Sequence, residues 1–111
     1  MVQRIRKEVR ELISGREFAE DLKKQGYSVE FNAQIKGTSG QVHHVDGIAK
    51  RHGKNTIVWL EESGNSITGI IKTFAIAYDT GADACYVVDE ELGEEERKLA
   101  EFYKIRLLSK G

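Results

Sequence analysis

Hydrophobic and polar positions divide the chain into eight segments, and the period of each segment predicts a helix or a strand. Residues 2–25, 67–79 and 94–103 carry apolar side chains every three or four positions, which is the spacing of amphipathic helices. Five shorter segments have the alternation or the continuous apolar character of strands: residues 27–35, 45–49, 57–61, 84–88 and 105–108. The predicted order is therefore α-β-β-β-α-β-α-β.

This order predicts an α/β fold with a mixed central sheet flanked by helices. Residues 45–49 and 57–61 are separated by the polar, glycine-containing stretch 51–55, as in an antiparallel hairpin. The later strand-helix-strand steps predict parallel neighbours joined by right-handed crossovers. In the first strand, period-two alternation places the apolar residues on one face of the sheet: Tyr27, Val29, Phe31, Ala33 and Ile35.

Two carboxylates fall on adjacent predicted strands. Asp46 lies within the segment 45–49, and Glu61 closes the apolar run 57–60. Because a hairpin brings the far ends of its strands together, we expect both carboxylates within reach of one divalent cation. Mg²⁺ or Mn²⁺ suits such a pair, completed by water and phosphate oxygens, whereas the sequence has no Cys or His pairs at the spacing of a structural zinc site.

Length and composition favour a single domain over residues 1–111. The chain is 40% hydrophobic and 32% charged, which argues against wholesale disorder. Its apolar stretches fall far short of the ~20 residues that span a bilayer, and the charged start resembles no signal peptide, so we expect a cytoplasmic protein without membrane contact. One cysteine, Cys85, excludes an intrachain disulfide and is expected to be buried.

The formal net charge of -1 conceals an uneven distribution along the chain. Lys and Arg gather in the first helix and in residues 50–54, whereas residues 89–101 are mostly acidic. A polyanion such as DNA would therefore bind locally. We expect the backbone of a nucleic acid to contact Lys50, Arg51 and Lys54 and to avoid the acidic end of the chain.

The motif Gly37-x-Ser39-Gly40-x-x-His43-x-x-Asp46, together with the element order, resembles the PD-(D/E)XK nuclease superfamily. Within it the sequence most resembles Mrr-type restriction endonuclease domains and archaeal Holliday junction resolvases, over most of the chain. The resemblance implies a restriction-endonuclease-like core in which Asp46 and Glu61 hold the metal and His43 assists catalysis. Ser39 and Gly40 are expected to offer backbone N–H groups to a phosphate.

Two positions depart from the pattern of that superfamily. Its members typically end the third strand in Glu-x-Lys or Gln-x-Lys, where the lysine helps to activate the attacking water. Here the residues read Glu61-Glu62-Ser63. Many resolvase-like members also carry a glutamate in the first helix, at a position that falls near Gly15 in this chain.

A second lysine could replace the missing one. Lys50 shares the strand face of Asp46 by period two, and Lys72 lies within the helical segment 67–79. Lys72 is the better candidate for catalysis because it interrupts an otherwise apolar helix face. The alternative is that Lys72 extends into solvent along the helix surface.

The two neighbouring histidines cannot both share a site with Asp46 on a regular strand. Period two selects His44, whereas the family motif selects His43, which requires an irregular backbone before residue 44. A further interpretation makes His43 a structural residue that bonds the loop around Ser39.

Two functions remain open at the level of sequence. The resemblance implies a magnesium-dependent endodeoxyribonuclease of the restriction or junction-resolving type, expected to act on DNA as a homodimer because a small single site must cut two strands. The serine in place of lysine favours instead a catalytically inactive nuclease-fold protein that binds nucleic acid or a protein partner.

Overall fold

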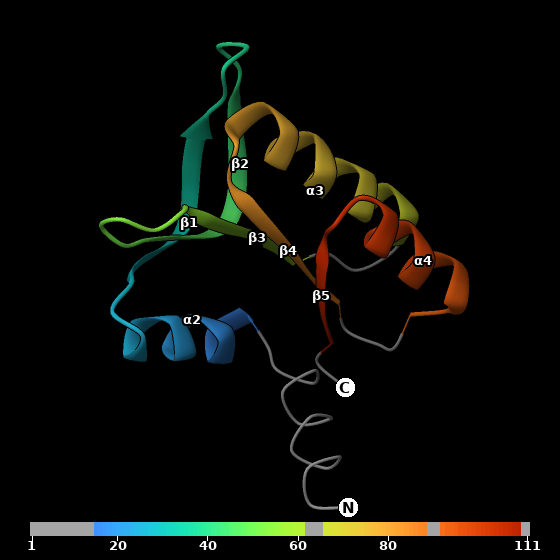
Figure 1. The fold of residues 1–111 in the computed structure, drawn as a ribbon, viewed down its shortest axis with the longest axis horizontal. Helices are drawn as coiled ribbons and strands as arrows, with labels where there is room; N and C mark the ends of the chain where they lie inside the picture. The colour runs from blue at the N-terminus through green and yellow to red at the C-terminus, as the bar shows by residue number, and fades with distance from the viewer. Residues whose placement is uncertain (1–14, 62–65, 89–91, 110–111) are drawn as a thin grey trace, which may run out of the picture.

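The computed structural model describes residues 15–61, 66–88 and 92–109. Its elements follow the order that the sequence predicts (Figure 1). The predicted helix over residues 2–25 is described only from Gly15 onward, and its first part lies outside the described residues. The elements are α2 (Gly15–Lys24), β1 (Ser28–Lys36), β2 (Val42–Lys50), β3 (Ile57–Glu61), α3 (Ser66–Thr80), β4 (Asp83–Val88), α4 (Glu94–Phe102) and β5 (Arg106–Ser109).

The strands form one five-stranded mixed sheet in the order β1-β2-β3-β4-β5. β1, β2 and β3 are antiparallel neighbours, whereas β3, β4 and β5 run parallel. Parallel neighbours need a long connection, which α3 and α4 provide. The predicted α/β fold with a mixed sheet is therefore confirmed, in the element order expected of a restriction-endonuclease-like core.

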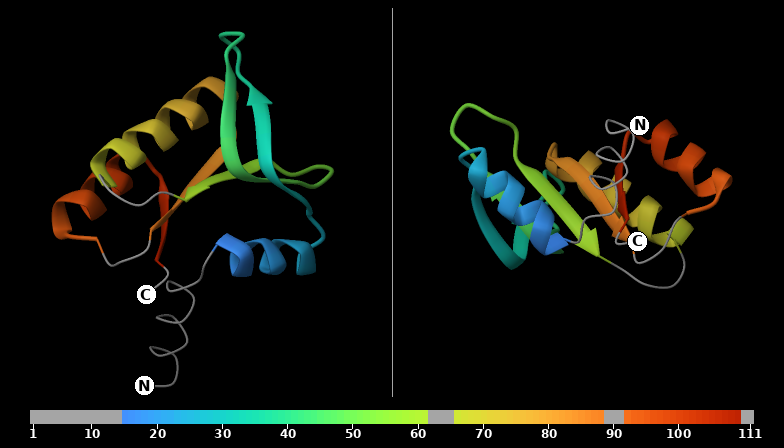
Figure 2. Two further views of the ribbon diagram at one scale, coloured as in Figure 1. Left: turned by 180° about the vertical axis from the view of Figure 1, so that it is seen from behind. Right: turned by 90° about the horizontal axis from the view of Figure 1, so that it is seen from below.

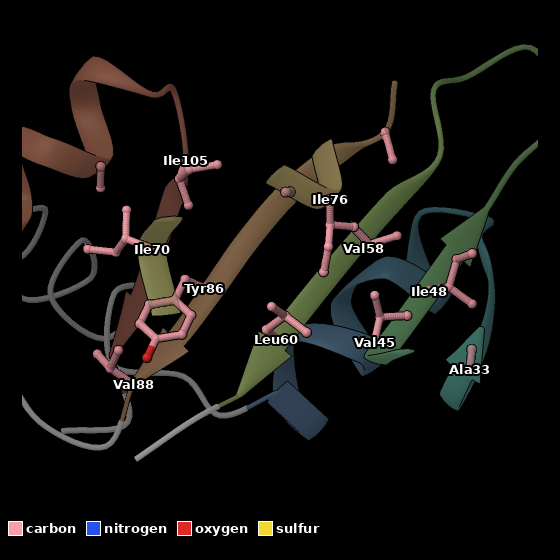
Figure 3. Close-up of a cluster of buried hydrophobic side chains, with 13 residues drawn as sticks. Ala33, Val45, Ile48, Val58, Leu60, Ile70, Ile76, Tyr86, Val88 and Ile105 are labelled. Atoms are coloured by element: carbon pink, nitrogen blue, oxygen red, sulfur yellow. The ribbon is translucent and has the colours of Figure 1, made fainter. Parts of the chain in front are cut away.

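Helices cover both faces of the sheet and give three layers (Figure 2). On one face, apolar side chains of α2 pack around Trp59 of β3, and the ring of Phe18 meets Trp59 edge to face at 5.3 Å between centroids. On the other face, α3 and α4 bury a larger cluster that includes Ile70, Ile76 and Tyr86 (Figure 3). No helix in the described ranges is long and apolar enough to cross a membrane.

Cys85 is buried in the cluster under α2, as the sequence predicts. Desolvation raises the pKa of Cys85 to about 12. The thiol is therefore protonated near neutral pH and behaves as a small apolar side chain.

The hairpin of β1 and β2 changes faces in the middle of each strand. In β1, Val29 and Phe31 lie on the side of α2, whereas Ala33 and Ile35 pack on the side of α3. The prediction that the apolar residues of this strand share one face is therefore wrong. The physical reason is Asn32, whose φ of 50° breaks the regular alternation between residues 31 and 33.

The same change occurs on β2, directly across the hairpin. Val45 and Ile48 are three residues apart, yet both pack in the cluster under α3 (Figure 3), an arrangement that a regular strand does not allow. Gly47 faces the other side and lies against the indole of Trp59. The switch in β2 therefore lies at Asp46, opposite Asn32, and it sets which side chains can surround Asp46.

Candidate functional site

Asp46 and Glu61 meet where the pairing between β2 and β3 ends. The last paired residues before this point are Gly47 and Trp59. One step beyond, the side chain of Asp46 replaces the backbone ladder, because its Oδ2 accepts a hydrogen bond of 2.6 Å from the backbone N–H of Glu61. The two residues are neighbours, as the hairpin predicts.

An open pocket of about 270 Å³ lies beside this contact. β1, β2 and β3 form its base, and α3 contributes one side chain, Lys72, from across the layer. Apolar and polar groups both line it: Asn32, Ala33, His44, Val45, Asp46, Leu60, Glu61 and Lys72. The structure thus brings Asp46, Glu61 and Lys72 of the predicted site to one pocket.

The carboxylate of Glu61 lies against Gly15, the first described residue of α2. A methyl group on Gly15 would overlap that carboxylate. This direction follows from alternation along β3, since Leu60 packs under α3 while Trp59 packs under α2. The position where the sequence lacks the expected first-helix glutamate is thus in contact with Glu61, and a longer side chain there would compete for the same space.

The donors at the pocket suit a hard cation that keeps part of its water. Oδ1 of Asp46 accepts no hydrogen bond from the described residues. Nowhere in the described ranges do three or more His, Cys, Asp or Glu side chains form a group that could hold a metal. Mg²⁺ needs only one or two carboxylates when water and phosphate oxygens complete its shell, so Asp46 and Glu61 fit Mg²⁺ or Mn²⁺ better than a zinc site.

His43 lies away from the pocket and contacts Asp79 near the end of α3. Its Nε2 is 2.7 Å from Oδ2 of Asp79, with both side chains largely buried. β2 already begins at Val42, so alternation puts His43 and His44 on opposite faces, and His44 is the one that lines the pocket. His43 is thus not among the residues that line the pocket, and its contact with Asp79 is the kind that the structural interpretation expects.

Ser39 and its neighbours bind the same aspartate at the tip of the hairpin. The backbone N–H of Ser39 donates to Asp79 Oδ1 at 2.9 Å and its hydroxyl donates to Oδ2 at 2.7 Å. Thr38 adds a hydroxyl donor to Oδ1 at 3.2 Å. We call Thr38, Ser39, His43 and Asp79 the clasp, because they hold the hairpin tip against α3 (Figure 1).

The clasp strongly favours the charged form of Asp79. Hydrogen bonds from His43 and then Ser39 hold the pKa of this carboxyl well below its usual range. Ser39 thus directs its hydroxyl and N–H to Asp79, and Gly40 forms the turn at the tip with a φ of 90°. Neither residue lines the pocket, so the expectation that both bind nucleic acid has no support from their placement.

The predicted basic contacts lie at the other end of β3. Arg51 and Lys54 are exposed in the turn before β3, and the guanidinium of Arg51 lies over the ring of Tyr27 at 5.9 Å. The pocket is at Glu61, roughly 13 Å along the strand. Lys50 is exposed and does not line the pocket, because it ends β2 four residues beyond Asp46, roughly 13 Å along the strand.

Asn32 and His44 line the pocket but were not among the residues assigned to the site from sequence. Alternation counted from Asp46 indicates His44, whereas the family motif indicates His43. For Asn32 the only signal was an asparagine within an apolar strand, a residue type that tolerates positive φ.

Comparison with known proteins finds a structure of similar fold but no matching family. No family model matches the chain, and no curated protein matches it significantly. The crystal structure of AF1548, a protein of unknown function, is similar with a TM-score of 0.67 and 19% sequence identity, over 86% of this chain. At that identity the likeness supports the fold alone. The match spans 55% of AF1548, so this chain corresponds to little more than half of that protein.

Proposed function

We propose that this chain is a metal-dependent DNA endonuclease of the PD-(D/E)XK type, of the restriction or junction-resolving class. The observation that carries the proposal is the placement of Lys72 in the pocket of Asp46. The sequence has Ser63 where a catalytic lysine is expected, and residues 62–65 lie outside the described ranges. Lys72 supplies a cation to the same pocket from α3.

Asp46, Glu61 and Lys72 have distinct tasks in this proposal. Asp46 and Glu61 would hold Mg²⁺ or Mn²⁺, which polarises a phosphoryl oxygen and lowers the pKa of a bound water. The N–H of Glu61 fixes the orientation of the Asp46 carboxylate through a bond of 2.6 Å. The ammonium of Lys72 stabilises negative charge that develops on the phosphate during attack by water. The reaction forms one P–O bond to water and breaks one P–O ester bond.

The direct test is cleavage of linear, branched and flapped DNA with Mg²⁺ or Mn²⁺. We expect the wild-type protein to nick at least one of these substrates and Asp46→Asn to lose the activity. This variant keeps an oxygen that can accept the Glu61 N–H but removes the charge. Asp79→Asn is the matched control, because it removes an aspartate charge outside the pocket. No cleavage of any substrate in either metal would overturn the proposal.

A second function is favoured by the direction of the Glu61 side chain. Its carboxylate lies against Gly15 of α2, on the side of the sheet away from Leu60 and α3. A protein that uses the nuclease fold only to bind nucleic acid or another protein would not need two convergent carboxylates. Calorimetry with Mn²⁺ separates this function from nuclease activity, since the inactive protein would bind no metal. For the inactive protein, a partner whose affinity does not change with salt would be a protein rather than a nucleic acid.

We further propose that the active form is a cytoplasmic homodimer. A single site that must cut both strands of DNA works best when a two-fold axis places one site on each strand. Light scattering on the purified protein measures this directly, and a monomer at the concentrations that support cleavage would contradict it.

A further inference from the structure

Asn32 has the most unusual backbone of the pocket residues. It lies in the middle of β1 with a φ of 50°, in the left-handed region that most residues avoid. Pairing with β2 continues on both sides of it, through Phe31 with Gly47 and Ala33 with Val45. The intervening level, Asn32 opposite Asp46, is absent from the ladder. The backbone irregularity of the hairpin is thus located at the pocket.

This conformation directs the side chain of Asn32 to the pocket while leaving its amide unused. Asn32 is exposed, and it lines the pocket together with Asp46 and Lys72. Its carboxamide makes no hydrogen bond within the part of the chain that the structure describes. Asparagine tolerates positive φ better than most residues, but glycine would do so without a side chain. A structural role alone therefore does not explain the amide.

We propose that Asn32 is a substrate-contacting residue whose Nδ2 hydrogens donate to a non-bridging phosphate oxygen of DNA bound beside Asp46. This inference rests on the proposed nuclease function. The carboxylates of Asp46 and Glu61 repel a phosphate, and Lys72 is the lining residue with a permanent positive charge. A neutral amide adds a donor for the phosphate, whereas the ammonium group of an additional lysine would compete with the metal ion for the carboxylates.

Two substitutions separate contact from backbone geometry. Asn32→Gly keeps the positive φ and removes the amide. Asn32→Asp keeps the shape and the tolerance of positive φ, but it replaces the donor with a negative charge. A hydrogen bond to a charged group corresponds to about 10- to 100-fold in affinity. We expect KM for DNA cleavage to rise about 10-fold in Asn32→Gly and toward 100-fold in Asn32→Asp.

The matched control is Gln34→Glu, which adds the same charge at an exposed position on the same strand outside the pocket. Its KM should change less than about threefold, the scale of a screened surface charge. Melting temperatures establish that each variant is folded. If Asn32→Gly does not fold, Asn32→Asp decides alone.

The outcomes distinguish this inference from the function on which it rests. If the wild-type protein cleaves DNA and both Asn32 variants keep its KM and kcat, the inference is wrong and the nuclease proposal stands. If Asn32→Asp raises KM no more than Gln34→Glu does, the effect is general charge and the contact is also refuted. If the wild-type protein neither binds nor cleaves DNA, the proposed function fails and this inference fails with it.

Discussion

Asp46 lies on β2 of the hairpin, whereas Asp79 binds the tip of that hairpin from α3, and the two aspartates have opposite environments. Asp79 receives the Ser39 N–H, two hydroxyl groups and His43 within 3.2 Å. Asp46 receives one backbone N–H from Glu61 and borders an open pocket. A carboxylate whose lone pairs are filled by the protein stabilises the fold, whereas one with an unused oxygen beside a pocket can bind a ligand. The chain therefore surrounds Asp79 with donors of its own and leaves Asp46 with an unused oxygen beside the pocket.

The contrast also divides the motif from Gly37 to Asp46 into two parts. Its first part, with Ser39 and His43, binds Asp79 and holds the hairpin tip against α3. Only its last residues reach the pocket. The residues of a motif that resembles a single catalytic signature therefore lie at two separate places, the clasp and the pocket.

We expect the largest effect on activity from Lys72, the cation that lines the pocket beside Asp46. Lys72→Gln should lower kcat for DNA cleavage by about 10²- to 10³-fold, as for other preorganised donors that stabilise transition-state charge. Lys98→Gln is the control, because Lys98 is also an exposed helical lysine and lies outside the pocket, where it pairs with Glu94 on α4 at 3.3 Å. Equal activity of the two variants in a steady-state assay would remove Lys72 from the mechanism.

The contribution of Asp79 to stability can be tested at Gly37. A methyl group there would overlap the carboxylate of Asp79, which cannot move without losing the donors of the clasp. We expect Gly37→Ala to lower the melting temperature by about 5 °C. The same substitution in an Asp79→Ala background is the control, because that background lacks the carboxylate that the added methyl would meet. An equal loss in both backgrounds would show that the overlap with Asp79 does not cause the loss of stability.

The acid dependence of stability tests the structural role of Asp79 in a second way. The pKa of Asp79 lies well below the ordinary value of about 3.9 because His43, Ser39 and Thr38 hydrogen-bond its charged form. Its stabilisation is therefore complete above about pH 4 and is lost as the pH falls toward the folded pKa. Thermal melts from about pH 5 down to about pH 2.5 should fall more steeply for wild type than for Asp79→Asn. Parallel curves would contradict this assignment.

The smallest effect is expected at the turn far from the pocket. If Arg51 and Lys54 each contact a phosphate, the double variant Arg51→Gln, Lys54→Gln should reduce the slope of log affinity against log salt by about 1.8. Fluorescence anisotropy with labelled DNA at several salt concentrations measures the slope. An unchanged slope would mean that DNA does not extend along β3 to this turn.

Hydrophobic period alone predicts the order and type of the described elements. α3 and β4 are examples, since Ile70, Phe74 and Ala77 recur at helical spacing in one cluster and residues 84–88 form a continuous buried run. The same reasoning does not predict which face of the sheet each side chain of β1 occupies. Alternation assumes a regular strand, and nothing in the apolar pattern shows that Asn32 adopts positive φ and inverts the alternation from that point.

The candidate site was predictable where it depends on topology. A hairpin must place Asp46 near Glu61, and the structure joins them by a hydrogen bond of 2.6 Å. The partner of His43 was not predictable, because Asp79 lies 36 residues further along the chain. Long-range side-chain contacts of this kind depend on how α3 packs on the sheet, which the sequence pattern does not specify.

Metal binding tests most directly whether Asp46 is the open carboxylate and Asp79 the structural one. Titration calorimetry with Mn²⁺ on wild type, Asp46→Asn and Asp79→Asn, each folded by circular dichroism, compares the two aspartates without depending on a DNA substrate. We expect wild type and Asp79→Asn to bind Mn²⁺ with similar affinity and Asp46→Asn to lose binding. Binding that survives in Asp46→Asn, or that is absent from the wild-type protein, would contradict the account.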